Sequence, residues 1–545
     1  MMRSGLNFRE RFVWKVAIAI TLVVIGDLLF FQWNYFGGYL GAFGLALVAG
    51  MVAARHHVRR DKRAWIAASG ASVFAFAMIY DASLLAWTLF WIAAGMAALL
   101  PATGTFDDGW RWFQRLLLHA LRSPFAPIFD TLRVVRVRRA RQRSRFSLRA
   151  ALPVIGLPLI GSAVIIALFA AANPVLEKLI STISIPDLTA IDIVRIMLWV
   201  LLFIMAWSLI HPRLARRIFP TFDGRGDLAI RGVSVASVRL SLIVFNLLFA
   251  LQNLMDAAYL SGLVQMPSDI TLAEYAHRGA YPLIATALLA GLFVIITLRP
   301  GSATAANPTI RKLVFLWIAQ NIVLVGSSIV RTLDYVEAYS LTILRISALA
   351  WMVLVATGLV LICWRLIADK SASWLINANL AAGTLLVTPI CFIDLGNIAA
   401  WWNVRHAKEV GGSGSALDLC YLENLGSSSL LPLISLERRN DLTPNLRVQI
   451  QATRMSVLQS LEWQMKSNWT MLGAHRLEQA TRELALLPPV TFKSGHLGCG
   501  GLYVPYQATP EVANNAEARS IRDNTKSATA QQPKSPSALT AETRK

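Results

Sequence analysis

Long apolar segments alternate with short polar segments along most of this chain. A helix that crosses a bilayer needs about 20 mostly apolar residues, because each residue adds about 1.5 Å along the helix axis. Eleven segments meet this requirement: Phe12–Phe31, Tyr35–Ala54, Ala64–Tyr80, Ala82–Leu100, Ala151–Ala172, Ile191–Ile210, Leu240–Tyr259, Ala280–Leu298, Leu313–Val330, Ile346–Trp364 and Leu375–Ile393. The pattern predicts an all-α, polytopic helical membrane protein with about 11 transmembrane helices.

The composition agrees with membrane insertion, since 55% of the residues are hydrophobic and 15% are charged. A soluble domain carries about 25% charged residues. Arg3, Arg9 and Arg11 precede the first apolar segment, as in a signal peptide. No small-residue cleavage site follows Phe31, so we expect this segment to be retained as a membrane anchor.

Lys and Arg residues are strongly biased to one set of loops. The N-terminal segment and every second loop after it carry 30 of them, whereas the intervening loops carry 4. Because basic residues stay on the cytoplasmic side, we expect a bacterial inner-membrane protein with a cytoplasmic N-terminus. An odd number of spans then places the C-terminal region in the periplasm. The net charge of +21 is mostly this topology signal, so it indicates contact with anionic lipid and not with nucleic acid.

Changes in composition divide the chain into five parts. They are a four-helix N-terminal membrane part (1–100), a basic amphipathic cytoplasmic loop (101–150), a membrane core with seven spans (151–394), a mainly helical extracytoplasmic domain (395–507) and a disordered tail (508–545). Within the extracytoplasmic domain, Leu446–Lys466 and Trp469–Leu487 have the pattern of two amphipathic helices.

The cytoplasmic loop is expected to lie on the membrane. Its first part places Trp110, Trp112, Phe113, Leu116, Leu117 and Leu121 on one helical face, and Arg111, Arg115 and Arg122 on the other. This pattern is typical of a helix in the membrane interface. Seven arginines follow, namely Arg133, Arg136, Arg138, Arg139, Arg141, Arg143 and Arg145. We interpret them as a clamp on anionic lipid, with docking of a regulatory partner as the alternative.

Cysteine and glycine positions add local expectations. Cys363 and Cys391 belong to spans and are expected to serve as small packing residues. Cys420 and Cys499 both lie in the extracytoplasmic region, where a disulfide could persist, and their pairing stays open. The four-residue spacing of Gly37 and Gly41 favours close packing of helices.

Ionisable and amide side chains at membrane depth are candidates for function because burying them in lipid is costly. The candidates are Asn246, Asn253, Asp256, Gln320, Asn321 and Arg331, with Asp334, Glu337 and Arg345 just beyond the ninth span. They form either structural hydrogen bonds between helices or a site for a polar ligand or proton. We expect Arg331 to contact Asp334, Glu337, Asp256 or Glu274. Asp27 is either a carboxylate that reaches the aqueous boundary or a functional group.

Glu274 and His277 are spaced so that they share one helical face, which suits acid–base chemistry. Thr271-x-x-Glu274 is also a capping box, in which Glu274 accepts from the first amide of its helix. Both interpretations stay open. One Glu and one His do not supply the three ligands of a catalytic zinc, so no metal and no cofactor are expected.

Several longer strings resemble a known family. They are FALQNLMD at 249–256, AEYAHRGAYPL at 273–283, LWIAQN at 316–321, YVEAYSLTILR at 335–345, IAAWWNV at 398–404 and LDLCYLENLG at 417–426. The chain resembles a bacterial membrane family defined as a domain of unknown function (the 4153/4173 group). The resemblance implies that these polar motifs belong to one site, but it implies no activity.

The function classes that remain are a non-enzymatic envelope sensor or assembly component, a proton- or ion-coupled transporter, and a membrane enzyme acting on lipid or glycan. The first is favoured, because no nucleotide loop, metal cluster or nucleophile motif is recognisable and no internal repeat supports transport.

Overall fold

The computed structural model describes residues 8–130, 190–214, 234–263 and 303–488, except 34 and 104–105, together with 286, 289, 292–293, 496–497 and 503–504. These residues are almost all helical, and a small antiparallel sheet pairs β1 (His496–Leu497) with β2 (Tyr503–Val504). Among them, eight helices are long and apolar enough to cross a membrane, and Gly38–Ala54 is a shorter apolar helix. The all-α polytopic prediction is confirmed. The segments expected to span at 151–172 and 280–298 fall largely outside the described residues.

Five helices form what we term the first membrane block. They are α1 (Phe8–Asp27, continued by the π-helix η1, Leu28–Gln32), α2 (Gly38–Ala54), α4 (Lys62–Tyr80), α5 (Leu84–Thr103) and α10 (Ala190–Ile210), with the short α3 (His56–Arg60) between α2 and α4. A Cβ atom on Gly41 would lie 2.2 Å from the Ala75 carbonyl oxygen, so α2 and α4 approach closely because this residue is glycine. The sequence grouped α10 with the later spans, whereas it packs on α1, α2 and α5.

Four long helices form the second membrane block. They are α11 (Val235–Leu260), α14 (Pro308–Tyr339), α15 (Ile343–Ile367) and α16 (Ala372–Ile390), with the short α13 (Ala303–Ala306) before α14. Each long helix begins where a side-chain oxygen accepts from a backbone amide of the first turn, the caps being Ser234, Asn307, Thr342 and Ser371. Pro308 adds a preset backbone angle at the first position of α14. The helix limits therefore follow local cap chemistry.

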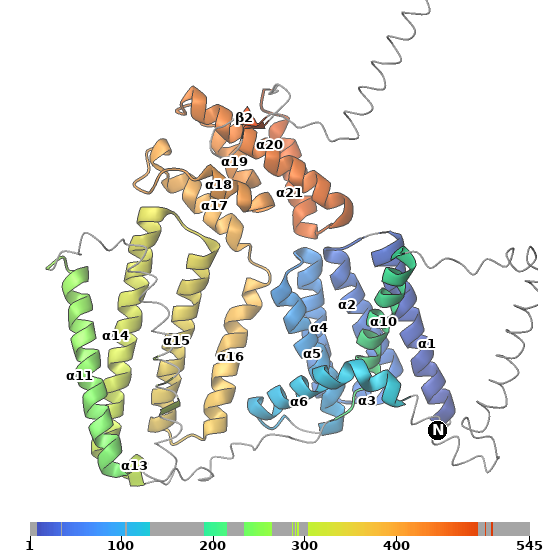
Figure 1. Cartoon of the computed structure of the whole chain (residues 1–545), viewed down its shortest axis with the longest axis horizontal. Coiled ribbons are helices and arrows are strands. Elements are labelled where there is room, and N and C mark those ends of the chain that lie inside the picture. Colours follow the sequence, from blue (N-terminus) through green and yellow to red (C-terminus); the bar gives the residue numbers. More distant parts are fainter. Residues whose placement is uncertain are drawn as a thin grey trace, which may run out of the picture.

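The helix α6 (Gly109–Arg122) lies across one end of the first block, reaches α16 of the second, and is followed by the turn η2 (Ser123–Phe125) (Figure 1). Its first amide, on Gly109, donates to Asn377 Oδ1 of α16 at 2.7 Å. Trp112 and Leu116 pack against the first block, while Phe113 and Leu121 stay exposed. An in-plane helix with an exposed apolar face fits the expected interfacial helix.

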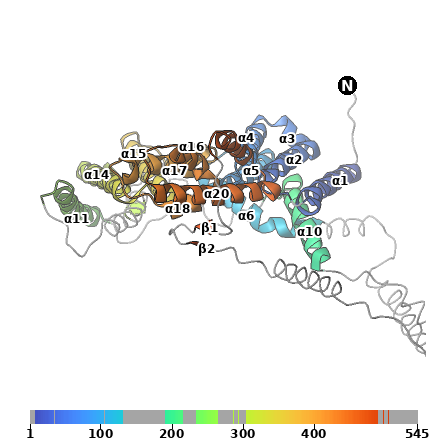
Figure 2. The same ribbon diagram turned by 90° about the horizontal axis from the view of Figure 1, so that it is seen from above.

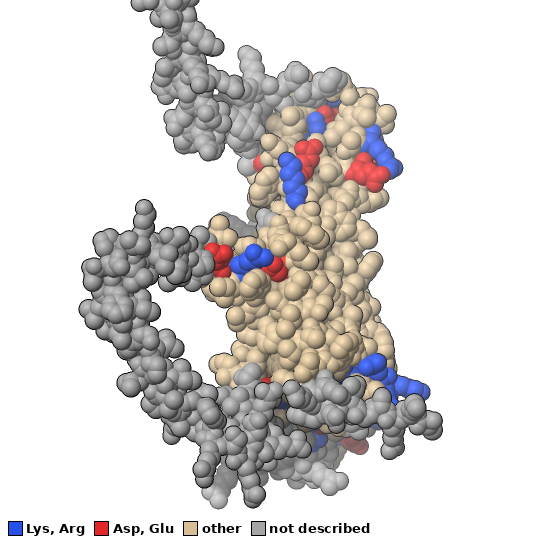
Figure 3. All heavy atoms as spheres, turned by 90° about the vertical axis from the view of Figure 1, so that its right-hand side faces the viewer, with Lys and Arg blue, Asp and Glu red and all other residues tan. Residues whose placement is uncertain are grey.

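The C-terminal domain covers the opposite end of both blocks (Figures 1 and 2). It comprises α17 (Leu395–His406), η3 (Lys408–Val410), α18 (Leu419–Asn424), η4 (Gly426–Ser429), α19 (Leu430–Glu437), α20 (Pro444–Ser467) and α21 (Met471–Leu484). Leu422, Leu433 and Ile450 belong to its own apolar core. The two expected amphipathic helices correspond to α20 and α21. Figure 3 shows a broad, mostly uncharged zone between charged groups toward the two ends, with a small cluster of basic and acidic groups at one side of it. A surface that faces lipid is expected to be largely uncharged.

Candidate functional site in the membrane

Polar side chains from α11 and α14 meet along the contact between these two helices. We term this set the polar ladder; it consists of Asn246, Gln252, Asn253, Asp256, Gln320, Ser327 and Arg331. Asn246 contacts Leu313, and Asp256, further along α11, contacts Arg331, further along α14. The two helices therefore run parallel. Because helical positions seven apart share a face, the spacing of Asn246 and Asn253 lets both contact α14.

Amide groups form the first part of the polar ladder. Asn246 Nδ2 donates to the Leu313 carbonyl oxygen at 3.0 Å, and Gln320 Nε2 donates to Asn246 Oδ1 at 3.2 Å. Asn253 Nδ2 donates to the Gln320 carbonyl oxygen at 3.1 Å. Hydrogen bonds of this kind between membrane helices each contribute about 0.6 kcal/mol. They fix the register of α11 against α14.

A buried ion pair closes the polar ladder at the end nearer the C-terminal domain. Asp256 and Arg331 are 3% and 7% exposed, and a guanidinium nitrogen of Arg331 lies against Asp256 Oδ2. Asp256 also accepts from Ser327 Oγ at 2.9 Å and from Gln252 Nε2 at 3.0 Å. Asp256 is one of the four partners expected for Arg331. The carboxylate is thus held by three donors, as a buried charge requires.

Some hydrogen-bonding capacity beside the polar ladder is unused within the described structure. Asn253 Oδ1, Gln320 Oε1 and Trp317 Nε1 are buried without a hydrogen-bond partner. Trp317 also lines an apolar cavity of about 370 Å³, together with Phe245 and Phe249 of α11. A buried polar group without a partner costs about 1–3 kcal/mol, so such groups mark places where water or a ligand would be favoured.

Asn321 does not belong to the polar ladder. It is 3% exposed, and its Nδ2 donates to the carbonyl oxygen of Trp317 in its own helix. Ser328 likewise donates to its own helix, at the Leu324 carbonyl oxygen. The helical period explains this difference, because Asn321 is offset by one residue from Gln320 and faces away from α11.

Asp334 and Glu337 lie on α14, past the apolar run that defines the ninth span. The apolar run ends at Val330, but α14 continues to Tyr339, so both acids are exposed side chains on a helix. No ion pair joins either of them to a described residue. Arg345 instead donates to the carbonyl oxygens of Tyr339 and Ser340 and lies 4.0 Å from the centre of the Tyr335 ring. It caps the C-terminal end of α14, where carbonyl groups lack partners within the helix.

Asp27 forms a second intramembrane ion pair, in the first block. It is 7% exposed and accepts from Arg195 Nε at 2.9 Å and from Arg195 Nη2 at 2.6 Å. Trp199 Nε1 donates to the same carboxylate at 2.8 Å. Asp27 is therefore held by Arg195 and Trp199 of α10, and both interpretations of this carboxylate stay predictions. No pattern in the sequence indicated this partner, because Arg195 lies 168 residues away.

Several expected site residues fall outside the part of the chain that the structure describes. They are Glu274, His277, Cys499 and the arginines Arg133, Arg136, Arg138, Arg139, Arg141, Arg143 and Arg145. The expected disordered tail also lies outside the described residues. Cys420 is disulfide-bonded, while Cys363 and Cys391 are free thiols. In the described residues, no group of three or more His, Cys, Asp or Glu side chains is placed to hold a metal ion.

Comparison with known proteins gives a family and no activity. Neither the curated proteins nor the solved structures contain a match to this chain. The model of one family, described as a domain of unknown function (DUF4153), matches residues 66–436. The match includes the polar ladder, α6 and the first part of the C-terminal domain, and it covers well over half of the chain. The protein is therefore a member of the DUF4153 family.

Proposed function

We propose that this protein is a non-enzymatic sensor or assembly component of a bacterial inner membrane, in which the C-terminal domain and the polar ladder act on each other. The N-terminus is cytoplasmic and the C-terminal domain periplasmic in this proposal, which the bias of Lys and Arg to alternate loops supports. A signal that binds or moves the C-terminal domain would change the packing of α11 on α14 inside the membrane.

The observation that carries this proposal is the length of α14. It has 32 residues, whereas about 20 suffice to cross a bilayer. Gln320, Ser327 and Arg331 of the polar ladder lie on this helix, and its last two turns continue toward the C-terminal domain. Because a helix is stiff along its axis, a displacement at Tyr339 is transmitted to Arg331 over about two turns.

The C-terminal domain holds the connection between α14 and α15 through specific hydrogen bonds. Asn403 accepts from the Leu341 amide at 2.7 Å and donates to the Leu341 carbonyl oxygen at 2.9 Å. Tyr421 Oη accepts from the Ile343 amide at 3.0 Å. Val336 and Leu341 pack with Ala399 of α17 in a small apolar cluster. The domain therefore contacts the end of α14 with both polar and apolar groups.

The same domain also contacts the first membrane block. The Phe36 amide donates to the Ser467 carbonyl oxygen at 2.7 Å, and the Gly38 amide donates to the Trp469 carbonyl oxygen at 2.6 Å. Gly37, with φ of 63°, makes this approach possible, because a Cβ atom there would lie 2.8 Å from the Asn468 carbonyl carbon. The domain thus bridges both blocks, which suits a sensing or assembly role.

Hydrogen exchange on the full-length protein in nanodiscs tests the proposed coupling. Asn403→Ala removes both bonds to Leu341, and we expect faster exchange in 327–339 of α14 as well as in α17. The matched control is Asn397→Ala, which removes a bond inside the domain, from Asn397 Nδ2 to the Ser428 carbonyl oxygen at 2.9 Å. We expect the control to leave α14 unchanged. Faster exchange of Asn403→Ala confined to α17 and 340–342 would contradict coupling through α14.

A proton- or ion-coupled transporter is the second candidate, favoured by the ion pair beside unpartnered amide oxygens and a cavity. Liposomes containing the protein and carrying an imposed pH gradient separate the two functions. Under the first proposal the gradient decays as slowly as in empty liposomes. A faster decay that Asp256→Asn abolishes would replace that proposal with transport. A membrane enzyme acting on lipid or glycan is the third candidate, and it rests on Glu274 and His277 alone.

A further inference from the structure

A polar cavity lies at the α6 end of the first membrane block, far along the chain from the polar ladder. Its volume is about 340 Å³. The polar side chains that line it are His119, Arg122 and Ser123 from α6 and η2, and Ser208, His211 and Arg213 from the end of α10. Ala126 and Phe129 complete the wall. Basic and hydroxyl groups therefore converge on one space beside an in-plane helix.

We term this space the basic cavity. The carboxylate of Asp130 contacts two of the residues that line it, His211 and Arg213. Asp130 is 4% exposed, forms an ion pair with Arg213 and accepts from Trp207 Nε1 at 3.0 Å. His211 Nε2 lies 3.5 Å from Asp130 Oδ1, and its Nδ1 lies 3.3 Å from Lys15 Nζ. Asp130, which is itself buried, therefore holds Arg213 and His211 in place.

Positive charge around the cavity exceeds the negative charge. Arg122 lines the cavity, is exposed and has no carboxylate within 4.0 Å among the described residues, whereas Asp130 is paired with Arg213. Lys15 adds a further cation, beside His211. Burial and the charge of Arg55 lower the pKa of His119 to about 4. Guanidinium groups in such a setting bind a phosphate by paired, charge-assisted hydrogen bonds.

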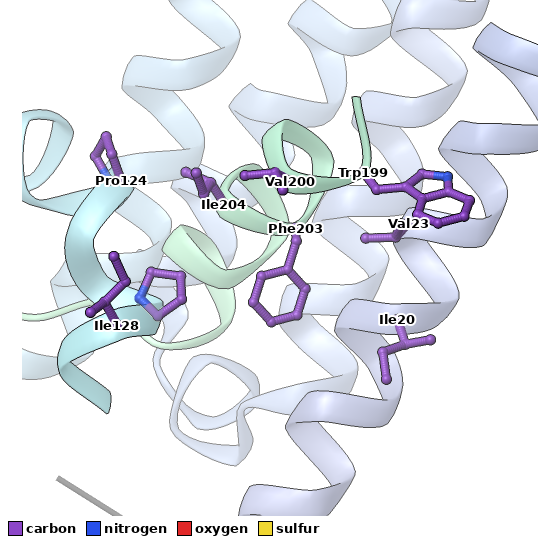
Figure 4. A pocket seen from close by; sticks show the side chains of 9 residues that line it. Ile20, Val23, Pro124, Ile128, Trp199, Val200, Phe203 and Ile204 are labelled. Atoms are coloured by element: carbon purple, nitrogen blue, oxygen red, sulfur yellow. The ribbon is translucent and has the colours of Figure 1, made fainter. Parts of the chain in front are cut away.

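An apolar groove of about 380 Å³ lies beside the basic cavity (Figure 4). Ile20 and Val23 of α1, Val200 and Phe203 of α10, and Ile128 point toward it. The segment 123–129 separates the two spaces, since Ser123, Ala126 and Phe129 line the basic cavity, whereas Pro124, Pro127 and Ile128 line the groove.

The helix α10 connects the two spaces directly. Phe203 lines the groove and stacks on Trp207 with ring centres 5.6 Å apart. Trp207 lies 5.6 Å from the ring of His211, which lines the basic cavity. The polar space thus lies at the α6 end of α10, and the apolar space lies one to two turns further along the same helix face.

We propose that the basic cavity and the groove together bind one anionic phospholipid, with its phosphate between Arg122 and Arg213 and an acyl chain in the groove. The surplus of positive charge selects an anionic headgroup, and a soluble phosphate would make no use of the apolar groove. This site is distinct from the polar ladder and from the expected clamp at 133–145, because it has defined walls on described residues.

Native mass spectrometry of the full-length protein in detergent tests the headgroup part. Phosphatidylglycerol and phosphatidylcholine with identical acyl chains are added at equal concentration, and we expect one phosphatidylglycerol to be retained in preference. Arg122→Gln should weaken its binding about fivefold, the usual contribution of one basic group. The matched control Arg60→Gln removes an exposed charge from α3, outside the cavity, and should change binding less than twofold. Equal binding of both lipids, or equal losses in both variants, would overturn the proposal.

A second pair of variants tests the acyl-chain part. Val200→Trp fills the groove, whereas Leu201→Trp places the same bulk on an exposed neighbour that does not line it. We expect Val200→Trp to weaken phosphatidylglycerol binding and Leu201→Trp to leave it unchanged. Inorganic phosphate at 100-fold excess should not displace the lipid. Displacement by inorganic phosphate, with normal binding in Val200→Trp, would show a soluble-phosphate site and overturn the phospholipid assignment.

Discussion

At the scale of single residues, Asp256 and Arg331 place opposite charges in the buried contact between α11 and α14. Each charge alone would cost several kcal/mol to bury, and their attraction compensates for this cost because the geometry is close and further donors satisfy the carboxylate. Ser327 and Gln252 supply those donors. The pair therefore specifies how α11 sits on α14, while its net contribution to stability stays small.

A double-mutant cycle on this pair follows from that account. Arg331→Gln leaves a buried carboxylate without its cation, so we expect a loss of about 3–5 kcal/mol in unfolding free energy. Adding Asp256→Asn removes the stranded charge, and the double variant should lose much less than the sum of the single losses. Unfolding in mixed detergent micelles measures both. Arg482→Gln is the control, because the Arg482–Glu478 pair is exposed and contributes at most about 0.5 kcal/mol. If Arg331→Gln lost no more unfolding free energy than this control, the ion pair would not be what holds α11 on α14.

His119 predicts a pH dependence of stability. Burial and the charge of Arg55 lower its pKa from 6.5 to about 4 in the folded protein. Below pH 6.5 the unfolded chain binds a proton that the folded chain does not, so the folded state loses stability as the pH falls from 6.5 toward 4. We expect the melting temperature to fall from pH 7 to pH 5, and less steeply in His119→Gln. The exposed His57→Gln variant should follow the unmodified protein. An identical fall in His119→Gln would exclude this residue as a cause.

At the scale of helices, the sequence predicted the membrane-crossing runs better than the helix ends. The run at Leu313–Val330 gave the right place for α14 but not its continuation to Tyr339. Apolar runs report the thickness of lipid, whereas a helix continues until its backbone is capped, here by Arg345. The shared face of Asn246 and Asn253 followed from helical periodicity. Their partners on α14 did not, because periodicity within one helix contains no information about its neighbour.

The close contact between α2 and α4 leaves no room for a methyl group at Gly41. Gly41→Ala would place a Cβ atom 2.2 Å from the Ala75 carbonyl oxygen, so the helices must separate and we expect a loss of about 1–3 kcal/mol. Gly70→Ala on α4 is the matched control, since the nearest atom to its Cβ would be 4.0 Å away. That change should be neutral or stabilise by up to about 1 kcal/mol through higher helix propensity. Equal melting temperatures for the two variants would contradict close α2–α4 packing.

At the scale of the whole molecule, a separate C-terminal domain was predictable, but its bridging position was not. The change to polar composition after Ile393 indicated the domain. Its contacts with the first block use backbone groups of Phe36, Gly38 and Trp469, which leave no trace in side-chain patterns. The pairing of α10 with α1 was equally hidden, because it depends on which spans become neighbours.

We predict that α16 crosses the membrane from the cytoplasm to the periplasm. The span α16 lies between Lys370 and Gly414. We expect a reporter fused after Lys370 to be active only in the cytoplasm and one fused after Gly414 only in the periplasm, given the bias of basic residues. Alkaline phosphatase and a fluorescent protein that fails to mature in the periplasm provide the two readouts. Activity of both fusions on the same side would remove α16 as a span.

The position of α6 and of the C-terminal domain has a mechanical consequence. Among the described helices, no span of the first block packs extensively on a span of the second. At one face α6 joins the blocks through the Gly109–Asn377 bond. At the other face the C-terminal domain joins them, through Gly38–Trp469 on the first block and Leu341–Asn403 on the second. Because the two joints lie at opposite faces, they oppose tilting of one block against the other. We therefore expect the lateral pressure of the bilayer to change mainly the distance between the two blocks. We therefore expect membrane stretching to load the joints at both faces at once.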